Sequence, residues 1–351
     1  MLVQQLFRDI NLADPFFDSL KQDYKEFTDW FNKKANQNES TFVFYLDKKI
    51  DGFMYLKVEE EELTEIIPNK PCKRRLKVGT LKINAHGTKL GERFIKKALD
   101  YLIYCNLDEI YLTVFDHHEG LIRLIEKYGF MKEATKNTIN GCEGVYFKRL
   151  NNKGNYNLYN SYPIINTINN RKHLLAIYPQ YHSRLLPDSI LKTEDDEEIV
   201  KDISHTNSIH KIYLCKMNHI ASVNIGDILC IYRTTPEKGR ANYLSVITSL
   251  CVIEEYKHIS EFTVVEDLLK YALPFSIFTE NELRDLYRTQ QYPYIIRFTY
   301  NVALPKRIIR KDLIEKIGLN ASSYWGSFEI TNDEFLKICK LGEINENLII
   351  N

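Results

Sequence analysis

The spacing of apolar residues changes several times along the first 150 residues. Two neighbouring segments, 40–47 and 52–61, alternate apolar and polar positions around a polar turn, which is typical of a β-hairpin. Other short apolar runs predict further strands at 2–10, 74–84, 109–115 and 144–150. Helical spacing predicts helices at 15–35, 92–106 and 121–130. This order predicts an α/β (α+β) fold, a mixed sheet with flanking helices.

A different pattern begins after Leu150. Residues 151–162 are rich in Asn and Gly, which is typical of a linker. Many short β-type runs follow, at 172–179, 210–217, 227–234, 243–256 and 294–304, with small helices between and after them. This spacing predicts a partly open β-barrel with small helices. We therefore divide the chain into a first domain at 1–150, a linker and connector at 151–204, and a second domain at 205–351.

Composition narrows the classes of protein to which the chain belongs. Its 351 residues are 44% hydrophobic and 27% charged, as in ordinary soluble proteins, and no apolar run is long enough to span a bilayer. We therefore expect a cytoplasmic protein with no membrane partner. Lys plus Arg equals Asp plus Glu at 47 each, so any polyanion site must be a local patch. The seven cysteines form no CxxC pair, and the histidines show no ligand spacing, so no metal site is predicted.

The segment 80–102 places a loop containing Gly87 and Gly91 between a strand and an amphipathic helix. A helix N-terminus presents unpaired backbone N–H groups and the positive end of the helix dipole, which together favour a bound phosphate. Glycine lets phosphate oxygens approach these amides closely. Lys89, Arg93 and the basic strand before the loop would add positive charge beside the same anion.

The order of these elements and this loop resemble the GNAT superfamily of N-acyltransferases, which bind acetyl-CoA. The family's Arg/Gln-x-x-Gly-x-Gly/Ala loop falls on residues 86–91, where Leu90 and Gly91 match, His86 replaces Arg or Gln, and Lys89 replaces the central glycine. The resemblance covers about residues 1–150. It implies acetyl-CoA as the cofactor, bound by Leu81, Ile83, His86, Gly87, Thr88, Lys89, Leu90, Gly91 and Glu92.

A second block, 110–130, is similar to the family's strand, loop and helix ending in Tyr-Glu-Lys-x-Gly-Phe. His118 stands where many members carry an asparagine that holds the pantetheine arm, and Ile125 where they carry the tyrosine that protonates the departing thiolate. The catalytic candidates are His118, whose pKa suits an acid or a base, and Tyr128, three residues beyond Ile125. The acidic run 59–62 is an alternative source of a carboxylate base.

Residues 205–340 resemble the PUA-like superfold, especially its EVE and ASCH branches, at the level of topology. The segment 226–233 enters a strand after Gly-Asp, and residues 276–283 form the inserted helix, where Thr279 and Glu282 have the spacing of a capping box. The resemblance implies a cleft for RNA or a modified base. Basic and aromatic residues suited to phosphate contact and base stacking are Arg233, Arg240, Lys306, Arg307, Tyr324 and Trp325.

Two hypotheses follow. The first is an acetyl-CoA-dependent N-acetyltransferase that transfers directly to an acceptor amine, with the second domain recruiting an RNA or RNA-associated substrate. The second is a catalytically weak or inactive GNAT-fold binding protein, an acetyl-CoA sensor or scaffold, with a PUA-like domain that binds RNA or a nucleotide. Ile125 and Lys89 favour the second hypothesis.

Overall fold

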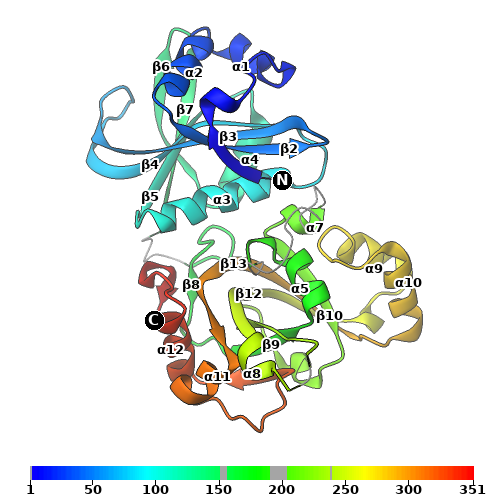
Figure 1. Cartoon of the computed structure of the whole chain (residues 1–351). Coiled ribbons are helices and arrows are strands. Elements are labelled where there is room, and N and C mark those ends of the chain that lie inside the picture. The colour runs from blue at the N-terminus through cyan, green and yellow to red at the C-terminus, as the bar shows by residue number, and fades with distance from the viewer. Residues whose placement is uncertain (1, 151–155, 190–203, 238) are drawn as a thin grey trace. The chain divides into compact units, whose positions relative to one another are not determined.

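The computed structural model describes residues 2–150, 156–189, 204–237 and 239–351. The chain divides into two compact units, Met1–Ser161 and Tyr162–Asn351 (Figure 1). Residues 162–189, which we assigned to the connector, therefore belong to the second unit. The rest of the expected linker and connector includes 151–155 and 190–203, which lie outside the described residues. Within the described part of the chain, no helix has both the length and the apolar character to cross a membrane.

The first unit is built around a seven-stranded mixed sheet with the strand order β1-β2-β3-β4-β5-β7-β6, which confirms the predicted fold class. Its strands are β1 Leu2–Leu6, β2 Ser40–Leu46, β3 Lys49–Leu63, β4 Lys70–Ile83, β5 Glu109–Phe115, β6 Met131–Thr138 and β7 Gly141–Arg149. The β4–β5 pair is parallel and the other neighbouring strands are antiparallel. The edge strand β6 was missed in the sequence because its residues are mostly polar.

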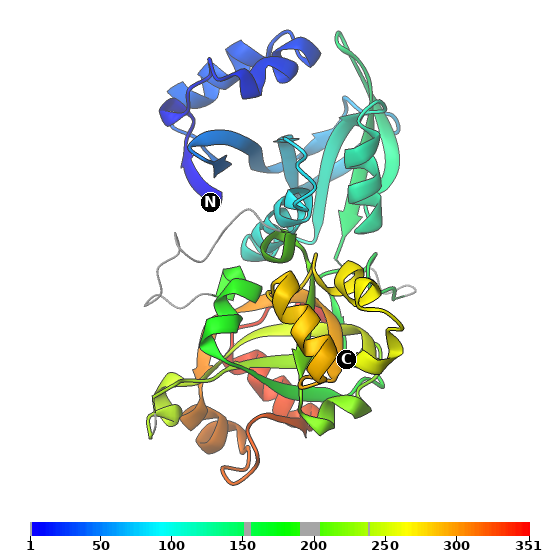
Figure 2. The ribbon, with the colours of Figure 1, turned by 90° about the vertical axis from the view of Figure 1, so that its right-hand side faces the viewer.

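Helices cover both faces of this sheet, as Figures 1 and 2 show. They are α1 Asp18–Asp23, α2 Phe27–Asn36, α3 Leu90–Tyr104 and α4 Glu119–Lys127, with 3-10 turns at Phe7–Asp9 and Pro15–Phe17. Successive side chains of β3 point to opposite faces of the sheet. Phe53 joins the aromatic core beneath α1 and α2, whereas Gly52 leaves room on the other face for the Phe94 ring of α3.

The single helix expected over residues 15–35 is interrupted at Tyr24. Tyr24 has an extended backbone (φ −129°, ψ 103°), which ends α1 before α2 begins at Phe27. Its hydroxyl donates a hydrogen bond to Glu143 on β7, 2.7 Å away. Local helical periodicity continues through this point, so the expectation of one helix was wrong; the break coincides with this long-range hydrogen bond, which the local pattern does not contain.

The second unit contains a six-stranded sheet with the order β10-β13-β12-β11-β9-β14. Its strands are β9 Lys172–Ile177, β10 His210–Cys215, β11 Ile228–Arg233, β12 Val246–His258, β13 Tyr294–Ile309 and β14 Ser327–Ile330; β8 Ile165–Asn166 pairs with β15 Ile349–Ile350. The sheet ends at β10 and β14 and does not close among the described strands, so the partly open architecture is confirmed. Strand β9 lies inside this sheet, parallel to β11, with Leu174 and Leu175 fully buried.

Small helices surround this second sheet. They are α5 Pro179–Leu185, α7 Ser204–Asn207, α8 Ala241–Leu244, α9 Val265–Ala272, α10 Glu280–Thr289, α11 Arg310–Asp312 and α12 Asn332–Leu341, with 3-10 turns at Pro187–Ser189, Asn218–Ser222, Ile259–Glu261 and Glu346–Leu348 and a π turn at Leu313–Ile317. Helices α9 and α10 lie side by side (Figures 1 and 2). The predicted capping box of α10 is confirmed: the Thr279 hydroxyl accepts from the Glu282 N–H, and the Thr279 N–H donates to the Glu282 carboxylate.

Candidate functional site

The sheet of the first unit opens between β4 and β5. The two strands pair from Leu76 with Ile110 to Val78 with Leu112, and no later pair joins them among the described residues, although β4 continues to residue 83 and β5 to residue 115. Beyond Val78, the backbone N–H and C=O groups on the β5 side of β4 therefore have no strand partner among the described residues. Such groups require water or a ligand as partner.

A β-bulge at Gly79 lies where this opening begins. On β3, Tyr55 pairs with the residue after Gly79 and Leu56 pairs with the residue before it, so Gly79 is an extra residue in β4. Bulges bend a strand and increase its twist, and they are common beside active sites. A Cβ atom at this position would lie 2.8 Å from the Tyr55 ring, so the local packing requires glycine.

A cavity of about 270 Å³ lies over the opening. Its walls come from α1 and α2, from the separating halves of β4 and β5, and from the β6–β7 hairpin. Its polar lining residues are Tyr24, Glu26, Lys77, Thr80, Thr113, His118, Lys136, Thr138, Asn140 and Glu143. Of the residues proposed from the sequence, the cavity contains His118 and Leu81.

Glu143 is the most buried carboxylate in the cavity wall, with only 3% of the residue exposed. One of its oxygens accepts hydrogen bonds from the Tyr24 hydroxyl at 2.7 Å and from the Thr113 hydroxyl at 3.1 Å. Burial and the neighbouring Glu143 carboxylate raise the pKa of Tyr24 far above its usual value, so Tyr24 remains a donor. Glu143 could not be predicted as a site residue from the sequence, because a lone acid in a strand carries no local signal.

His118 is the residue at the N-cap position of α4 and is exposed at the edge of the same cavity. Its Nε2 lies 3.4 Å from Oδ2 of Asp23, the last residue of α1. Burial and the neighbouring His117 lower the pKa of His118, while Asp23 opposes that shift. A largely neutral imidazole at neutral pH follows, which is the form able to accept a proton.

The other catalytic candidate, Tyr128, is fully buried and is not among the residues that line the cavity. Ile125 is also fully buried. The acidic run on β3 is not among the residues that line the cavity either: Glu59 accepts from the Tyr111 hydroxyl and lies 3.0 Å from Nζ of Lys57 and 3.5 Å from Nζ of Lys77. Glu59 thus touches the cavity only through the Lys77 side chain.

The predicted phosphate loop joins β4 to α3 at the open end of the sheet. Gly87 (φ 75°) and Lys89 (φ 59°) both have left-handed backbone conformations, and Lys89 is the N-cap residue of α3. The His86 ring lies 2.7 Å from the Asp51 carboxylate, which anchors the loop to β3. These features give the loop a defined shape at a helix N-terminus, the arrangement suited to an anion.

The remaining predicted cofactor residues lie in different environments. Leu90 is buried, and the buried carboxylate of Glu92 lies 3.1 Å from Nζ of Lys127 on α4. Ile83 is half-buried, and Thr88 lies in the loop. A Cβ atom at Gly91 would lie 2.6 Å from a methyl group of Leu124, so Gly91 lets α3 approach α4 closely.

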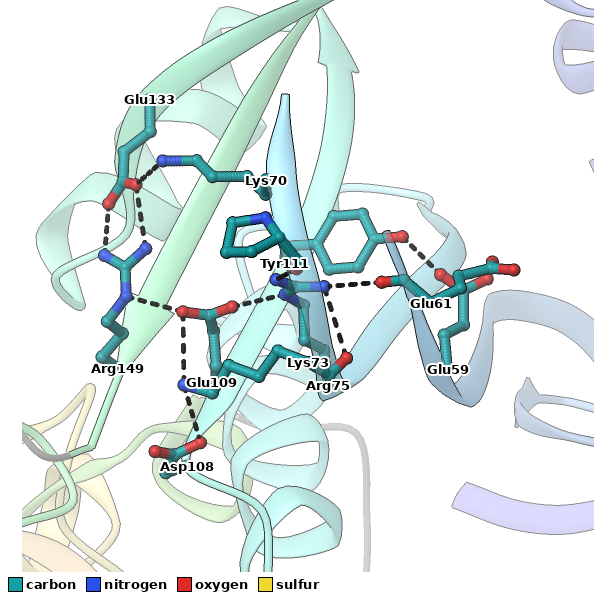
Figure 3. Close-up of polar contacts among 11 residues, drawn as sticks. Glu59, Glu61, Lys70, Lys73, Arg75, Asp108, Glu109, Tyr111, Glu133 and Arg149 are labelled. Atoms are coloured by element: carbon teal, nitrogen blue, oxygen red, sulfur yellow. Dashed lines mark hydrogen bonds and ion pairs between the residues drawn. The ribbon is translucent and has the colours of Figure 1, made fainter. Parts of the chain in front are cut away.

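The basic residues at the start of β4 do not supply positive charge to the loop, which corrects that part of the expectation. Figure 3 shows that the basic residues at the start of β4 are paired within the unit. Arg75, only 2% exposed, donates to Glu109 at 2.6 Å, and Glu109 also accepts from Arg149. Lys70 lies 2.7 Å from the Glu133 carboxylate. This network lies at the end of β4 opposite the loop.

The second unit has its own cavity, of about 340 Å³, with a mainly aromatic lining. The aromatic side chains are Tyr178, Tyr181, Tyr213, Phe278, Tyr292, Tyr324 and Trp325. Tyr178 and Tyr324 are 62% and 74% exposed, which leaves their rings accessible to a ligand. Lys216 is the charged lining residue.

Three of the four basic residues proposed to bind nucleic acid contact other groups of the second unit. Arg240 is paired with Glu237 at 2.8 Å, Lys306 lies 3.7 Å from Glu343, and Arg307 donates to the Asp188 carbonyl. None of the four predicted basic residues lines the described cavity. Tyr324 and Trp325 do line it, and Arg310, which was not predicted, lies over the Trp325 ring at 4.6 Å.

Comparisons with known proteins find no matching family model and no matching curated protein. Solved structures of two kinds each match somewhat less than half of the chain. ASCH from Zymomonas mobilis is 11% identical over 49% of this chain and 95% of its own, with a TM-score of 0.32. Ard1 from Thermoplasma volcanium is 13% identical over 42% of this chain and 96% of its own, with a TM-score of 0.34. Arabidopsis thaliana NAA60 in complex with acetyl-CoA is 14% identical over 42% of this chain and 99% of its own, with a TM-score of 0.31.

Proposed function

We propose that the first unit binds acetyl-CoA in the opening between β4 and β5 and transfers its acetyl group to an amine in the adjoining cavity. The observation that carries this proposal is the bulge at Gly79, after which β4 leaves β5 beside a cavity whose wall contains Glu143. A narrow ligand arm with amide groups suits the open strand edge, because it can pair with the backbone there.

The chain's own residues fit such a ligand. The β4–α3 loop, with left-handed Gly87 and Lys89, supplies a shaped helix N-terminus for a phosphate group. The opening of the sheet supplies space for the thioester-bearing arm, and acetyl-CoA when bound supplies an activated acetyl group. Leu81 lines the cavity where the arm would pass.

Glu143 is the proposed general base. In the transfer, the amine nitrogen bonds to the acetyl carbon, the carbon–sulfur bond breaks, and the amine proton passes to a base while the thiolate takes up a proton. Tyr24 and Thr113 donate to one Glu143 oxygen and thereby orient the carboxylate. His118, at the edge of the same cavity, is largely neutral, so the proton for the thiolate comes from water rather than from its imidazole.

Calorimetric titration of the full-length protein with acetyl-CoA tests the binding proposal. Gly91→Trp places a large side chain against Leu124 at the start of α3 and should abolish binding. Tyr104→Trp, at the exposed far end of the same helix, is the matched control and should bind as the wild type does. Because Gly91→Trp also strains the α3–α4 contact, Thr113→Trp, which fills the cavity from β5, provides a second variant.

Turnover separates the enzyme from a binding protein. Free-thiol release from acetyl-CoA is measured with a short peptide that carries a free N-terminal amine, and with the same peptide acetylated at its N-terminus. Release that requires the free amine supports transfer. Tight binding of acetyl-CoA without release above the rate in buffer, across peptides and free amines, would favour an acetyl-CoA sensor or scaffold.

For the second unit, we propose that the aromatic cavity binds an unpaired nucleobase and so recruits an RNA-associated substrate. The exposed Tyr324 ring, together with Trp325, offers flat apolar faces for stacking, and base stacking on aromatic side chains contributes about 1–3 kcal/mol per base. Arg310 over the Trp325 ring adds positive charge beside this surface. The absence of basic lining residues other than Lys216 among the described residues favours recognition of a base over recognition of a long phosphate backbone.

A further inference from the structure

Three side chains able to bind a metal ion meet at the edge of the first unit's cavity. Asp23 ends α1, and His117 and His118 lie in the turn between β5 and α4. One ligand atom from each of the three residues lies within 4.8 Å of the other two. The sequence did not reveal this set, because Asp23 is remote from the histidine pair along the chain.

The separation between Asp23 and His118 is compatible with two ligands of a transition-metal ion. Asp23 Oδ2 and His118 Nε2 are 3.4 Å apart, which is long for a hydrogen bond between an imidazole and a carboxylate. Two ligands of a tetrahedral Zn²⁺, at bond lengths of about 2.0–2.2 Å, are separated by about 3.4 Å. The same separation therefore leaves room for an ion between these two atoms.

The imidazole of His117 is held by contacts between rings. It stacks on the Phe115 ring, with centroids 5.5 Å apart and an interplanar angle of 13°, and its centroid is 4.1 Å from that of His118. Among the residues that the structure describes, no hydrogen-bond partner is recorded for the His117 ring nitrogens. Two imidazoles held together beside a carboxylate form a ligand set that Zn²⁺ and related ions favour.

We infer that Asp23, His117 and His118 form a binding site for one divalent transition-metal ion of the Zn²⁺ and Co²⁺ class. Three protein ligands leave a further coordination position open to water or to a ligand. Because His118 also lines the cavity, the ion binds at the cavity edge and links α1 to the β5–α4 turn. This site stands on its own geometry and does not require that the unit bind acetyl-CoA.

The test uses tag-free full-length protein without acetyl-CoA. Calorimetric titration with Zn²⁺ should give one site per chain, and Co²⁺ should show the visible absorption of a low-coordinate complex. Each ligand variant should weaken Zn²⁺ binding by at least roughly tenfold to hundredfold, because even removal of a group that only supports a ligand has an effect of that size. These variants are Asp23→Asn, His117→Gln and His118→Gln. His86→Gln removes a similarly exposed imidazole, near Asp51, and should leave Zn²⁺ affinity unchanged.

A second measurement keeps the inference testable if one variant folds poorly. Zn²⁺ should raise the melting temperature of the wild type and of His86→Gln but not that of the ligand variants, each compared with its own metal-free sample. Failure of the wild type to bind Zn²⁺ would overturn the inference. So would equal Zn²⁺ affinity in the wild type and in folded Asp23→Asn and His118→Gln, since this would assign the ion to other surface histidines.

Discussion

The Tyr24 hydroxyl donates to the Glu143 carboxylate across 2.7 Å, although the two residues are 119 positions apart. This hydrogen bond connects the break between α1 and α2 to β7, on the wall of the cavity beside the sheet opening. It joins a local departure from helical geometry to the placement of a buried carboxylate. The proposed chemistry depends on that carboxylate.

Replacing Glu143 with glutamine removes the proposed base but retains the side chain's shape and an oxygen able to accept from Tyr24. We expect acetyl-CoA affinity to be retained and the rate of acetyl transfer to fall by about 100-fold or more, the usual contribution of a general base. Calorimetry and thiol release measure the two quantities. Glu119→Gln is the control, because Glu119 is exposed on α4 and paired with Arg123. Equal rates in the Glu143→Gln variant and the wild type would exclude Glu143 as the base.

Arg75→Met should destabilise the first unit by about 3 kcal/mol, because it removes one of the two arginines that lie 2.6 Å from the buried Glu109 carboxylate, and Arg75 is the buried one of the two. Urea unfolding measures this change in the free energy of unfolding. Arg123→Met breaks an exposed ion pair with Glu119 and should change stability by less than about 1 kcal/mol. If the two substitutions change the free energy of unfolding by similar amounts, the ion-pair network in Figure 3 does not stabilise the fold.

Gly129→Ala should destabilise the first unit by at least about 2 kcal/mol. Gly129 has a φ of 81°, and a Cβ atom there would lie 2.1 Å from the carbonyl oxygen of Asn160. Gly120→Ala, in α4, is the matched control. A Cβ atom at Gly120 meets open space, so this substitution should stabilise the helix by about a few tenths of a kcal/mol. If thermal unfolding shows Gly129→Ala to be more stable than Gly120→Ala, the left-handed conformation at Gly129 after α4 is contradicted.

The second unit should lose stability as the pH falls from about 6.5 towards 3. Burial lowers the pKa of His182 to about 3, so between these values the unfolded chain binds a proton that the folded unit does not. His205, whose pKa burial also lowers to about 3, contributes in the same direction. His182→Phe should reduce the slope of unfolding free energy against pH by up to about 1.4 kcal/mol per pH unit.

Thr248→Val is the matched control for that experiment. The Thr248 hydroxyl lies 2.8 Å from Nε2 of His182, so this variant removes the imidazole's hydrogen-bond partner but keeps the buried ring. It should lower stability at every pH and keep the slope. An unchanged slope in His182→Phe would show that His182 is protonated in the folded unit.

Trp325→Ala should weaken binding of a short single-stranded RNA oligonucleotide by about tenfold, because it removes one stacking surface of the aromatic cavity. Fluorescence anisotropy at several salt concentrations measures it. Since the predicted Lys306 and Arg307 do not line the cavity, their substitution by glutamine should change affinity little, and the salt dependence should be shallow. A steep salt dependence that Lys306→Gln reduces would restore the backbone-contact interpretation.

Periodicity along the chain was sufficient to identify most strands and helices of both units. The alternation in β2 and β3 and the helical stripe of α3 depend on which side chains face the core, a property that each short segment carries in its own sequence. The capping box at Thr279 is equally local. The loop before α3 was also visible, because glycines between a strand and a helix form a short contiguous pattern.

The site itself depended on contacts between distant segments. Glu143 became a candidate base only because β7 places it beside Tyr24, and the basic residues of β4 lost their expected role because Glu109 and Glu133 lie next to them in the sheet. The bulge at Gly79 likewise exists only relative to β3. Strand register, side-chain pairing and burial are set by packing of the whole unit, so a linear pattern predicts the elements and tertiary structure decides which of their side chains meet.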